Sequence, residues 1–549
     1  MFRSNLLNKS GVEKPNLFYI FLLLLVFFGA EIIINPIGNF PLNDDWAYAE
    51  ATKKLATNFK FDPGYVPSMT LFTHCLWGSV FVKLFGFSHT ILRFSTLILS
   101  FISILFFYFL LIQLCHLKRK QSFYVSSLVF INPLFLSLSN SFMTDVPFIT
   151  FILGGLYFYS KFCQNGKIVY YLLTACFLIW ALLIRQLALS FIIGIIVVDC
   201  FMSKKIQWRS IALFIISFIV LFILEKWLKV NDTSFGYPYI FYKNRSTIDS
   251  ISILDMIINF FKRWIHYISF SGFVLIPILG PYLVYYFKNK LFLFQKKQFI
   301  ISVILLLPVL WSLQKFPLGD YLYNCGVGAE TLYDTYILRI NNQHGQSNLL
   351  FIGIWLMSLI GSFSLLLILI QFLFLALKWD RDQAKKNEVL TLIVVSLFFY
   401  YSFLAMASPI FDRYLVVFSV LIIPVLLSIY NPIVNNRKLF SVFFIILCAF
   451  SILANKDYLT ENRNKWLAIN DLKTTLFISD NDINGGKEHE ANCFGNHTWW
   501  YKKWCNFPKS NYLLCHGRIP NYHYFKSYTY QRYVPFKTDT IFVLVKNEE

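Results

Sequence analysis

The chain has 549 residues, of which 57% are hydrophobic and only 14% are charged, and its mean hydropathy is +0.57. Soluble globular domains carry charge on about a quarter of their residues, so this composition excludes a soluble enzyme and indicates a membrane protein with many crossings. The net charge of +20 does not indicate a nucleic-acid partner, because the basic residues of membrane proteins collect in cytoplasmic loops.

Apolar runs occur throughout the first 454 residues. About 20 mostly apolar residues are needed to cross roughly 30 Å of hydrocarbon. The first run has no small-residue cleavage pattern after it, so we interpret it as a retained span and not as a signal peptide. The predicted spans are thirteen, at residues 17–37, 90–114, 122–139, 146–163, 168–184, 187–202, 210–229, 264–288, 298–315, 349–377, 389–408, 412–430 and 438–454.

Basic residues mark one side of the membrane. If the N-terminus is cytoplasmic, the predicted cytoplasmic loops are all basic, for example HLKRKQ and KNKLFLFQKKQ. The short connections on the other side, SNSFMTDV and SPIFDR, hold one basic residue between them, which is the asymmetry of the positive-inside rule. Thirteen spans place the C-terminus outside, together with the loops at residues 38–89, 230–263 and 316–348.

The first outer loop, residues 38–89, contains two further predicted helices. Residues 44–58 have the pattern of an amphipathic helix on the membrane surface. Residues 71–87 are apolar but contain His74 and Lys83, and counting them as a span would place the later basic loops outside. We therefore predict an interfacial or re-entrant helix there.

The last part of the chain, residues 455–549, is rich in Asn, Asp, Lys, Tyr and Trp, and it ends in the strand-like DTIFVLVK. Turn signals such as DNDINGG separate its elements. We predict a small extracytoplasmic domain of mixed α/β type here, after a transmembrane domain over residues 1–454. The ten cysteines lack the spacing of a zinc site, and an outside compartment would permit a disulfide within the tail, among Cys493, Cys505 and Cys515.

Ionisable residues near the outer ends of the spans form the candidate site. Charge at the edge of a membrane is costly and usually marks a site. Carboxylates beside arginines indicate an acid/base centre next to an anion-binding patch, and the guanidinium group suits a phosphate, here that of a lipid. The candidates are Asp44, Asp45, Arg93, Asp145, Arg185, Gln186, Asp412 and Arg413, with His74 as a secondary one.

Each candidate also has a structural interpretation. Asn43 or Asp44 could cap the surface helix, and Asp145 could cap the span that it precedes. Arg185 could extend toward the outer headgroups, although a basic residue in an outer turn departs from the charge rule. Asp412 and Arg413 could pair only with each other, which contributes little when the pair is exposed.

Several segments, taken in chain order, resemble the motifs of a known family. They are the acidic pair after the first span and the segments VKLFGFSHTILRFSTLILS, NPLFLSLSNSFMTDVPF, LLIRQLAL and FDRYLVVFSVLIIPVLL. Together they resemble the membrane glycosyltransferases of the GT-C fold, and within them glycosyltransferase family 39, which includes protein O-mannosyltransferases and lipid A aminoarabinose transferases. The resemblance covers most of residues 15–430 and does not extend to the tail.

The resemblance implies transfer of a hexose or pentose from a polyprenyl-phosphate carrier to a lipid, glycan or protein acceptor outside the membrane, generally with inversion at the anomeric carbon. Asp44 matches the first acid of the family motif, the general base, and Asp45 stands where relatives often have Glu. Asp145 matches a second acid that shapes the site. The expected contacts of the donor phosphate are Arg185, Gln186 and Arg93.

The chain departs from the aminoarabinose branch, which has a Lys-Pro-Pro segment where this sequence reads YVPSMTLF. The donor and acceptor of that branch are therefore not expected here. Some relatives use a divalent cation, and Asp44 with Asp145 would supply the oxygen ligands that such cations prefer; no cofactor is certain. The bias toward Phe, Ile, Asn and Lys suggests an AT-rich bacterial genome, and hence an inner-membrane protein with a periplasmic C-terminus.

The chemistry of such a transfer agrees with these residues. A phosphate leaving group needs charge stabilisation more than a strong acid, and an acceptor hydroxyl needs a carboxylate within reach. Two other functions stay open: a flippase or other transporter of lipid-linked oligosaccharides, which would carry charges along a path through the membrane, and an outer-face polysaccharide polymerase or ligase. A scaffold without catalysis is a further alternative.

Overall fold

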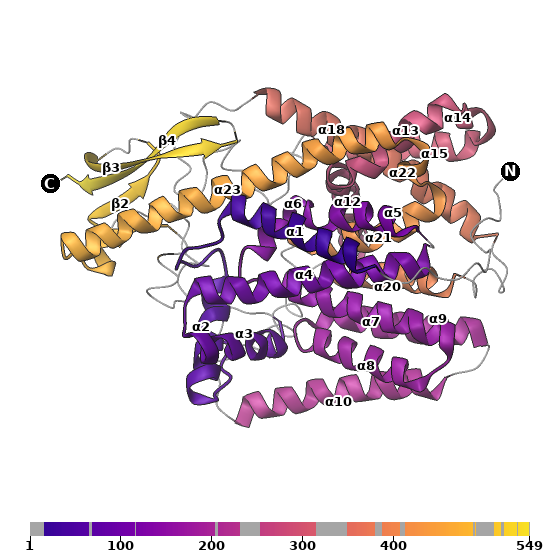
Figure 1. Cartoon of the computed structure of the whole chain (residues 1–549), viewed down its shortest axis with the longest axis horizontal. Helices are drawn as coiled ribbons and strands as arrows, with labels where there is room; N and C mark the ends of the chain where they lie inside the picture. The colour runs from indigo at the N-terminus through magenta and orange to yellow at the C-terminus, as the bar shows by residue number, and fades with distance from the viewer. Residues whose placement is uncertain are drawn as a thin grey trace.

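The structure is a computed structural model that describes most of residues 16–547. Helices dominate the described part, and one small β-sheet lies near the C-terminus (Figure 1). The ranges outside this description are residues 1–15, 65–68, 116, 204–206, 231–252, 314–347, 379–386, 407–411, 487–488, 490–509, 518–520, 535 and 548–549.

The elements follow each other in this order. The first helices are α1 (Leu17–Ile34), α2 (Asp45–Asn58), α3 (Phe72–Phe85), α4 (His89–Leu114), α5 (Arg119–Phe130), α6 (Pro133–Ser139), α7 (Asp145–Asn165), α8 (Ile168–Leu182), α9 (Leu189–Ser203) and α10 (Trp208–Val230). The later helices are α12 (Ile253–Val274), α13 (Ile276–Lys288), α14 (Leu291–Phe294), α15 (Lys296–Leu313), α18 (Asn348–Ala376), α20 (Glu388–Met406), α21 (Leu415–Ile429), α22 (Pro432–Asn435) and α23 (Arg437–Thr475). The 3-10 turns are η2 (Gln186–Ala188), η3 (Asp412–Tyr414) and η4 (Asp480–Asp482), and the strands are β1 (Ile483–Asn484), β2 (Tyr512–Cys515), β3 (Tyr522–Tyr533) and β4 (Phe536–Lys546).

Each predicted span coincides with one or two of these helices. Within the described residues, seven helices are long and apolar enough to cross a membrane, or nine if each of two bent helix pairs forms one span. Helices α3, α8 and α21 are apolar but shorter. An integral membrane protein with several crossings is therefore confirmed, and the number thirteen stays a prediction.

Two predicted spans, residues 122–139 and 264–288, are bent helix pairs and not straight helices. α5 and α6 meet at 68°, and α12 and α13 meet at 91°. A proline lies in the first turn of the second helix of each pair, Pro133 in α6 and Pro277 in α13. Proline is tolerated in a first turn but interrupts a helix interior. Asn132 reinforces the first break, since its side chain accepts two backbone N–H groups of α6.

The two helices predicted in the first outer loop are present. α2 and α3 pack against each other, and they lie at the same end of the bundle as the β-sheet (Figure 1). α3 has 14 residues, which at 1.5 Å per residue is about 21 Å and too short to cross the hydrocarbon layer. Its length agrees with the prediction that this segment is not a full span.

The chain ends in a four-stranded sheet of order β1-β2-β4-β3. β1 and β2 pair in parallel, and the other two pairs are antiparallel, so the strands predicted in the tail are present and form one small sheet. Its core joins Ile469 and Leu472 of α23 to Leu514, Ile541 and Val543 of the strands. The sheet is therefore fixed to one face of α23.

The predicted domain boundary at residue 454 falls inside α23. This helix continues for 39 residues, although its sequence changes from apolar to polar near the middle. The change in polarity does not end the helix, because residues 437–475 contain neither proline nor glycine. α23 therefore connects the membrane part directly to the sheet.

Several predictions concern residues outside the described ranges. Most of the outer loops predicted at residues 230–263 and 316–348 lie there, and so do Cys493 and Cys505. Cys515 is buried in β2, where its thiol donates to the carbonyl of Gly517. A disulfide in the tail stays a prediction.

Candidate active site

Asp44 precedes α2, and its carboxylate faces a residue far along the chain. Its Oδ2 lies 3.7 Å from a guanidinium nitrogen of Arg413 in η3. Asp44 makes no side-chain capping hydrogen bond to α2, so the capping interpretation is not supported. The Asp44 side chain is 16% exposed, against 4% for Arg413, and it therefore keeps some access from solvent.

Asp45 has a different role from its neighbour. Its Oδ1 accepts the N–H of Leu42 at 2.7 Å, and its Oδ2 accepts the N–H of Phe142 at 3.1 Å. The side chain is buried, so its two oxygens stabilise backbone on two sides. Asp45 thereby joins the first outer loop to the segment that leads into α7.

Asp145 and Arg185 form a second, fully buried ion pair. Their closest N···O distance is 2.8 Å, and the side chains are 3% and 4% exposed. The Arg185 guanidinium also donates to the Thr144 hydroxyl from Nε at 3.0 Å and from Nη2 at 2.7 Å. Arg185 therefore points into the protein and not toward headgroups. Asp145 is the first residue of α7, whose capping position is Thr144, so the capping interpretation of Asp145 is not supported.

The two ion pairs meet around two tyrosines that the sequence prediction did not include. The Tyr414 ring lies 5.3 Å from the Arg185 guanidinium and 5.5 Å from that of Arg413. Such cation–π contacts orient a guanidinium over an aromatic face. The two arginines therefore lie on a shared aromatic support, although they are far apart in sequence.

Tyr48 of α2 is the second tyrosine. Burial raises the pKa of its hydroxyl, and the charges of both ion pairs act on it as well. Tyr48 follows Asp44 by four residues, a spacing that brings side chains to one face of a helix. That spacing was the available sequence signal for Tyr48, and adjacency to Arg413 was the signal for Tyr414.

Arg93 of α4 lies against backbone and not against the two ion pairs. The buried guanidinium donates to the carbonyls of Pro36, Gly38 and Phe40, the last at 3.1 Å. These three contacts hold the guanidinium against the segment before α2. The geometry therefore favours a structural role for Arg93 over the expected contact with the donor.

His74 and Gln186 border the site. The His74 ring stacks on Phe142 with centroids 4.0 Å apart, and its Nε2 lies 3.2 Å from the Phe142 carbonyl. Burial lowers the pKa of His74 to about 3, so the ring is neutral and donates to that carbonyl. Gln186 is half-buried and follows Arg185 at the start of η2. The side chain of Asp412 is outside the described part.

The carboxylates that could hold a metal, if one were present, do not form a cation site. Within the described residues, no group of three or more His, Cys, Asp or Glu side chains is placed to hold a metal ion. Asp44 and Asp145 each face an arginine instead. A divalent cation would have to displace these guanidinium groups from its oxygen ligands, so the residues present do not fit it.

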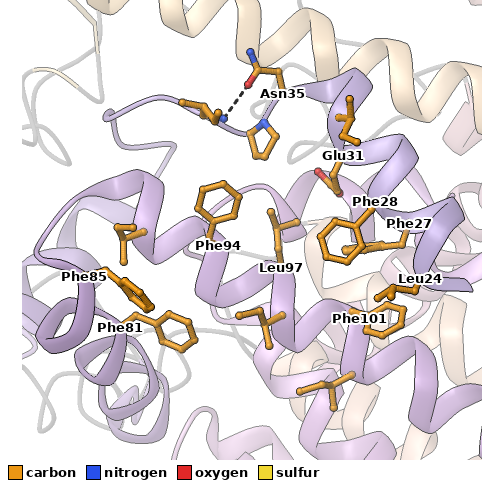
Figure 2. Close-up of a pocket in the computed structure, with 16 residues that line it drawn as sticks. Leu24, Phe27, Phe28, Glu31, Asn35, Phe81, Phe85, Phe94, Leu97 and Phe101 are labelled. Atoms are coloured by element: carbon orange, nitrogen blue, oxygen red, sulfur yellow. Dashed lines mark hydrogen bonds between the residues drawn. The ribbon is translucent and has the colours of Figure 1, made fainter. Parts of the chain in front are cut away.

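An apolar cavity lies beside the segment that leads to Asp44 (Figure 2). It has a volume of ≈ 760 Å³, is partly open, and is lined mainly by side chains of α1, α3 and α4. Phenylalanine and aliphatic side chains dominate its lining, among them Phe27, Phe85 and Phe94, and Glu31 is the charged residue of the set. Its wall is therefore suited to a hydrocarbon chain.

Comparisons with known proteins agree with this membrane architecture. The family profile described as "Dolichyl-phosphate-mannose-protein mannosyltransferase" matches residues 74–228, less than a third of the chain. This range includes Arg93, Asp145 and Arg185 but not Asp44 or Arg413. The comparison with curated proteins finds no match.

Two crystal structures of ArnT from Cupriavidus metallidurans are similar to this chain at 11% sequence identity. The apo structure has a TM-score of 0.40 and covers 86% of this chain and 82% of its own. The structure bound to undecaprenyl phosphate has a TM-score of 0.39 and covers 87% and 88%. Likeness at this level carries no functional inference. The family profile, by contrast, supports the resemblance to the family 39 membrane glycosyltransferases indicated by the sequence motifs.

Proposed function

We propose that the protein is a membrane glycosyltransferase that moves a sugar from a polyprenyl-phosphate carrier to an acceptor hydroxyl at the outer face of the membrane. The observation that carries the proposal is the Asp44 carboxylate, which is partly accessible beside Arg413, while Arg413 shares the Tyr414 ring with Arg185. It combines a base with a cationic patch in one place. The matched mannosyltransferase profile supports the same class of reaction.

In the proposed reaction, Asp44 takes the proton of the acceptor hydroxyl while the acceptor oxygen forms a bond to the anomeric carbon. The bond between that carbon and the phosphate oxygen breaks, and polyprenyl phosphate leaves with the electron pair. Attack from the face opposite the phosphate inverts the anomeric centre. The product is the glycosylated acceptor, with the proton on Asp44.

Arg185 and Arg413 have the proposed role of stabilising the phosphate. A guanidinium group presents paired N–H donors that match phosphate oxygens. Both arginines are held by carboxylates and by Tyr414, so little reorganisation would be needed as charge develops on the leaving group. The apolar cavity between α1, α3 and α4 would accommodate part of the isoprenoid chain.

The proposed orientation has the N-terminus in the cytoplasm and the sheet domain outside, in the inner membrane of a bacterium. It is supported by the basic residues of the loops predicted to be cytoplasmic. It is also supported by a contact between α23 and residues 35–44, here called the acidic loop, where the Asn43 amide donates to the Tyr458 hydroxyl at 3.4 Å. The transporter alternative has less support. The two ion pairs gather beside α2 at one end of the bundle, whereas a transporter needs polar groups near the middle of the membrane.

The test is release of polyprenyl phosphate from a panel of labelled polyprenyl-phosphate sugars, including the mannose donor, with candidate acceptors present. Wild type should release the carrier, and Asp44→Asn should be slower by about 10²- to 10⁴-fold, the usual contribution of a general base. Glu50→Gln is the matched control, because Glu50 is an exposed carboxylate on the same helix. Equal release by wild type and Asp44→Asn would remove Asp44 from the mechanism.

A further inference from the structure

The segment from Ile34 to Phe40 is held by two arginines that come from different parts of the chain. Arg93 of α4 donates to the carbonyls of residues 36, 38 and 40. Arg463 of α23 donates to the carbonyl of residue 37 at 3.1 Å, to that of residue 34 at 3.4 Å and to that of residue 35. Six carbonyls of this seven-residue segment therefore accept from a guanidinium.

Further contacts fix this segment and the peptide between it and Asp44. The Gly38 N–H donates to the Thr90 hydroxyl at 3.2 Å. Asn43 has a left-handed backbone, with φ of 54°, and its amide donates to the Tyr458 hydroxyl of α23. Asn tolerates this conformation better than most residues. The peptide before Asp44 is thus fixed to α4 on one side and to α23 on the other.

The outer half of α23 is itself anchored to the sheet. The Asp457 carboxylate accepts hydrogen bonds from the Arg532 guanidinium at 2.8 Å and from the Tyr533 N–H at 2.8 Å. One turn further, Glu461 lies 3.1 Å from a ring nitrogen of His516. Because Asp457 and Glu461 flank Tyr458 on the same helix, the sheet contacts restrain the turn that holds Asn43.

We propose that Arg463 is a positioning residue for Asp44, and that the C-terminal domain serves as a rigid support for the loop that carries this carboxylate. The proposal rests on the proposed function, in which Asp44 takes a proton. A misplacement of about 1 Å at a reacting group costs on the order of 10²-fold in rate. Loss of the Arg463 contacts should therefore lower kcat more than it weakens donor binding.

The experiment compares Arg463→Met, Arg463→Lys and the control Lys473→Met in the full-length protein. Lys473 lies on the same helix but pairs with Asp480, away from the acidic loop. Arg463→Met should lower kcat by about 10- to 100-fold with KM for the donor changed less than threefold. Arg463→Lys keeps one cationic donor and should recover part of the loss, and the control should match wild type.

Amide hydrogen exchange over residues 36–44 provides a readout that does not depend on activity. Arg463→Met should exchange faster there than wild type, whereas the control Lys473→Met should not, because Lys473 pairs with Asp480 and not with this segment. Unchanged exchange in Arg463→Met, or a kcat equal to wild type, would overturn the proposal. If wild type transfers no sugar, the proposed function fails, and the exchange result still decides whether Arg463 fixes the loop.

Discussion

Replacing Arg532 with methionine should loosen the junction between α23 and the sheet. The Arg532 side chain is 2% exposed and lies 2.8 Å from Asp457 and 3.3 Å from Asp539, whose side chains are 1% and 4% exposed. Removing the guanidinium leaves two buried carboxylates without this cation. Breaking one side of a buried ion pair costs about 3–5 kcal/mol, which is the expected loss of local stability.

Hydrogen exchange in the full-length protein in detergent measures this loss. Since 1.36 kcal/mol corresponds to a factor of ten, exchange in β3 and β4 should accelerate by roughly 150- to 5,000-fold if these amides open with the junction. Lys537→Met is the control, because Lys537 also lies 3.6 Å from Asp539 but is 32% exposed, and such pairs contribute at most about 1 kcal/mol. Unchanged exchange in Arg532→Met would refute the reasoning.

Two further substitutions test the packing of the site. Gly38→Ala should destabilise the acidic loop by about 1–3 kcal/mol, since a Cβ there would lie 2.1 Å from the buried Phe40 ring. Thermal unfolding should show this loss of stability. The control Gly353→Ala should show no loss, because a Cβ there meets nothing within 4 Å. Arg185→Met should lower the unfolding temperature because it leaves Asp145 buried without its cation, and adding Asp145→Asn should restore part of it; a double variant no more stable than Arg185→Met would contradict this.

The helical architecture follows from the sequence because hydrocarbon thickness sets the length of an apolar span. The surface helix α2 and the short helix α3 are also predictable, from amphipathic pattern and from charge placement. The bends before Pro133 and Pro277 depend on where a proline falls within an apolar run, which a hydropathy count does not weigh. The continuation of α23 past residue 454 depends on helix propensity, which does not require the sequence to stay apolar.

The sequence predicts which residues belong to the site better than it predicts which of them contact each other. Two ion pairs form, Asp44 with Arg413 and Asp145 with Arg185. The sequence could not show that Arg413 faces Asp44, because that contact joins residues far apart in the chain. The contacts of Arg93 could not be predicted for the same reason: its carbonyl partners lie on a loop whose path is set by tertiary contacts. Contacts between segments that are distant in sequence leave no local periodicity, so they cannot be predicted from a sequence pattern.

The central claim is that Asp44 is the base of a sugar transfer from a polyprenyl-phosphate carrier. The measurement that tests it most directly is the pH dependence of carrier release by wild type, Asp44→Asn and Glu50→Gln, with donor binding measured in parallel. The account predicts that Asp44→Asn binds donor, loses release by about 10²-fold or more and loses the acidic limb of the profile, while Glu50→Gln follows wild type. Release by Asp44→Asn at the wild-type rate, with the acidic limb retained, would contradict it.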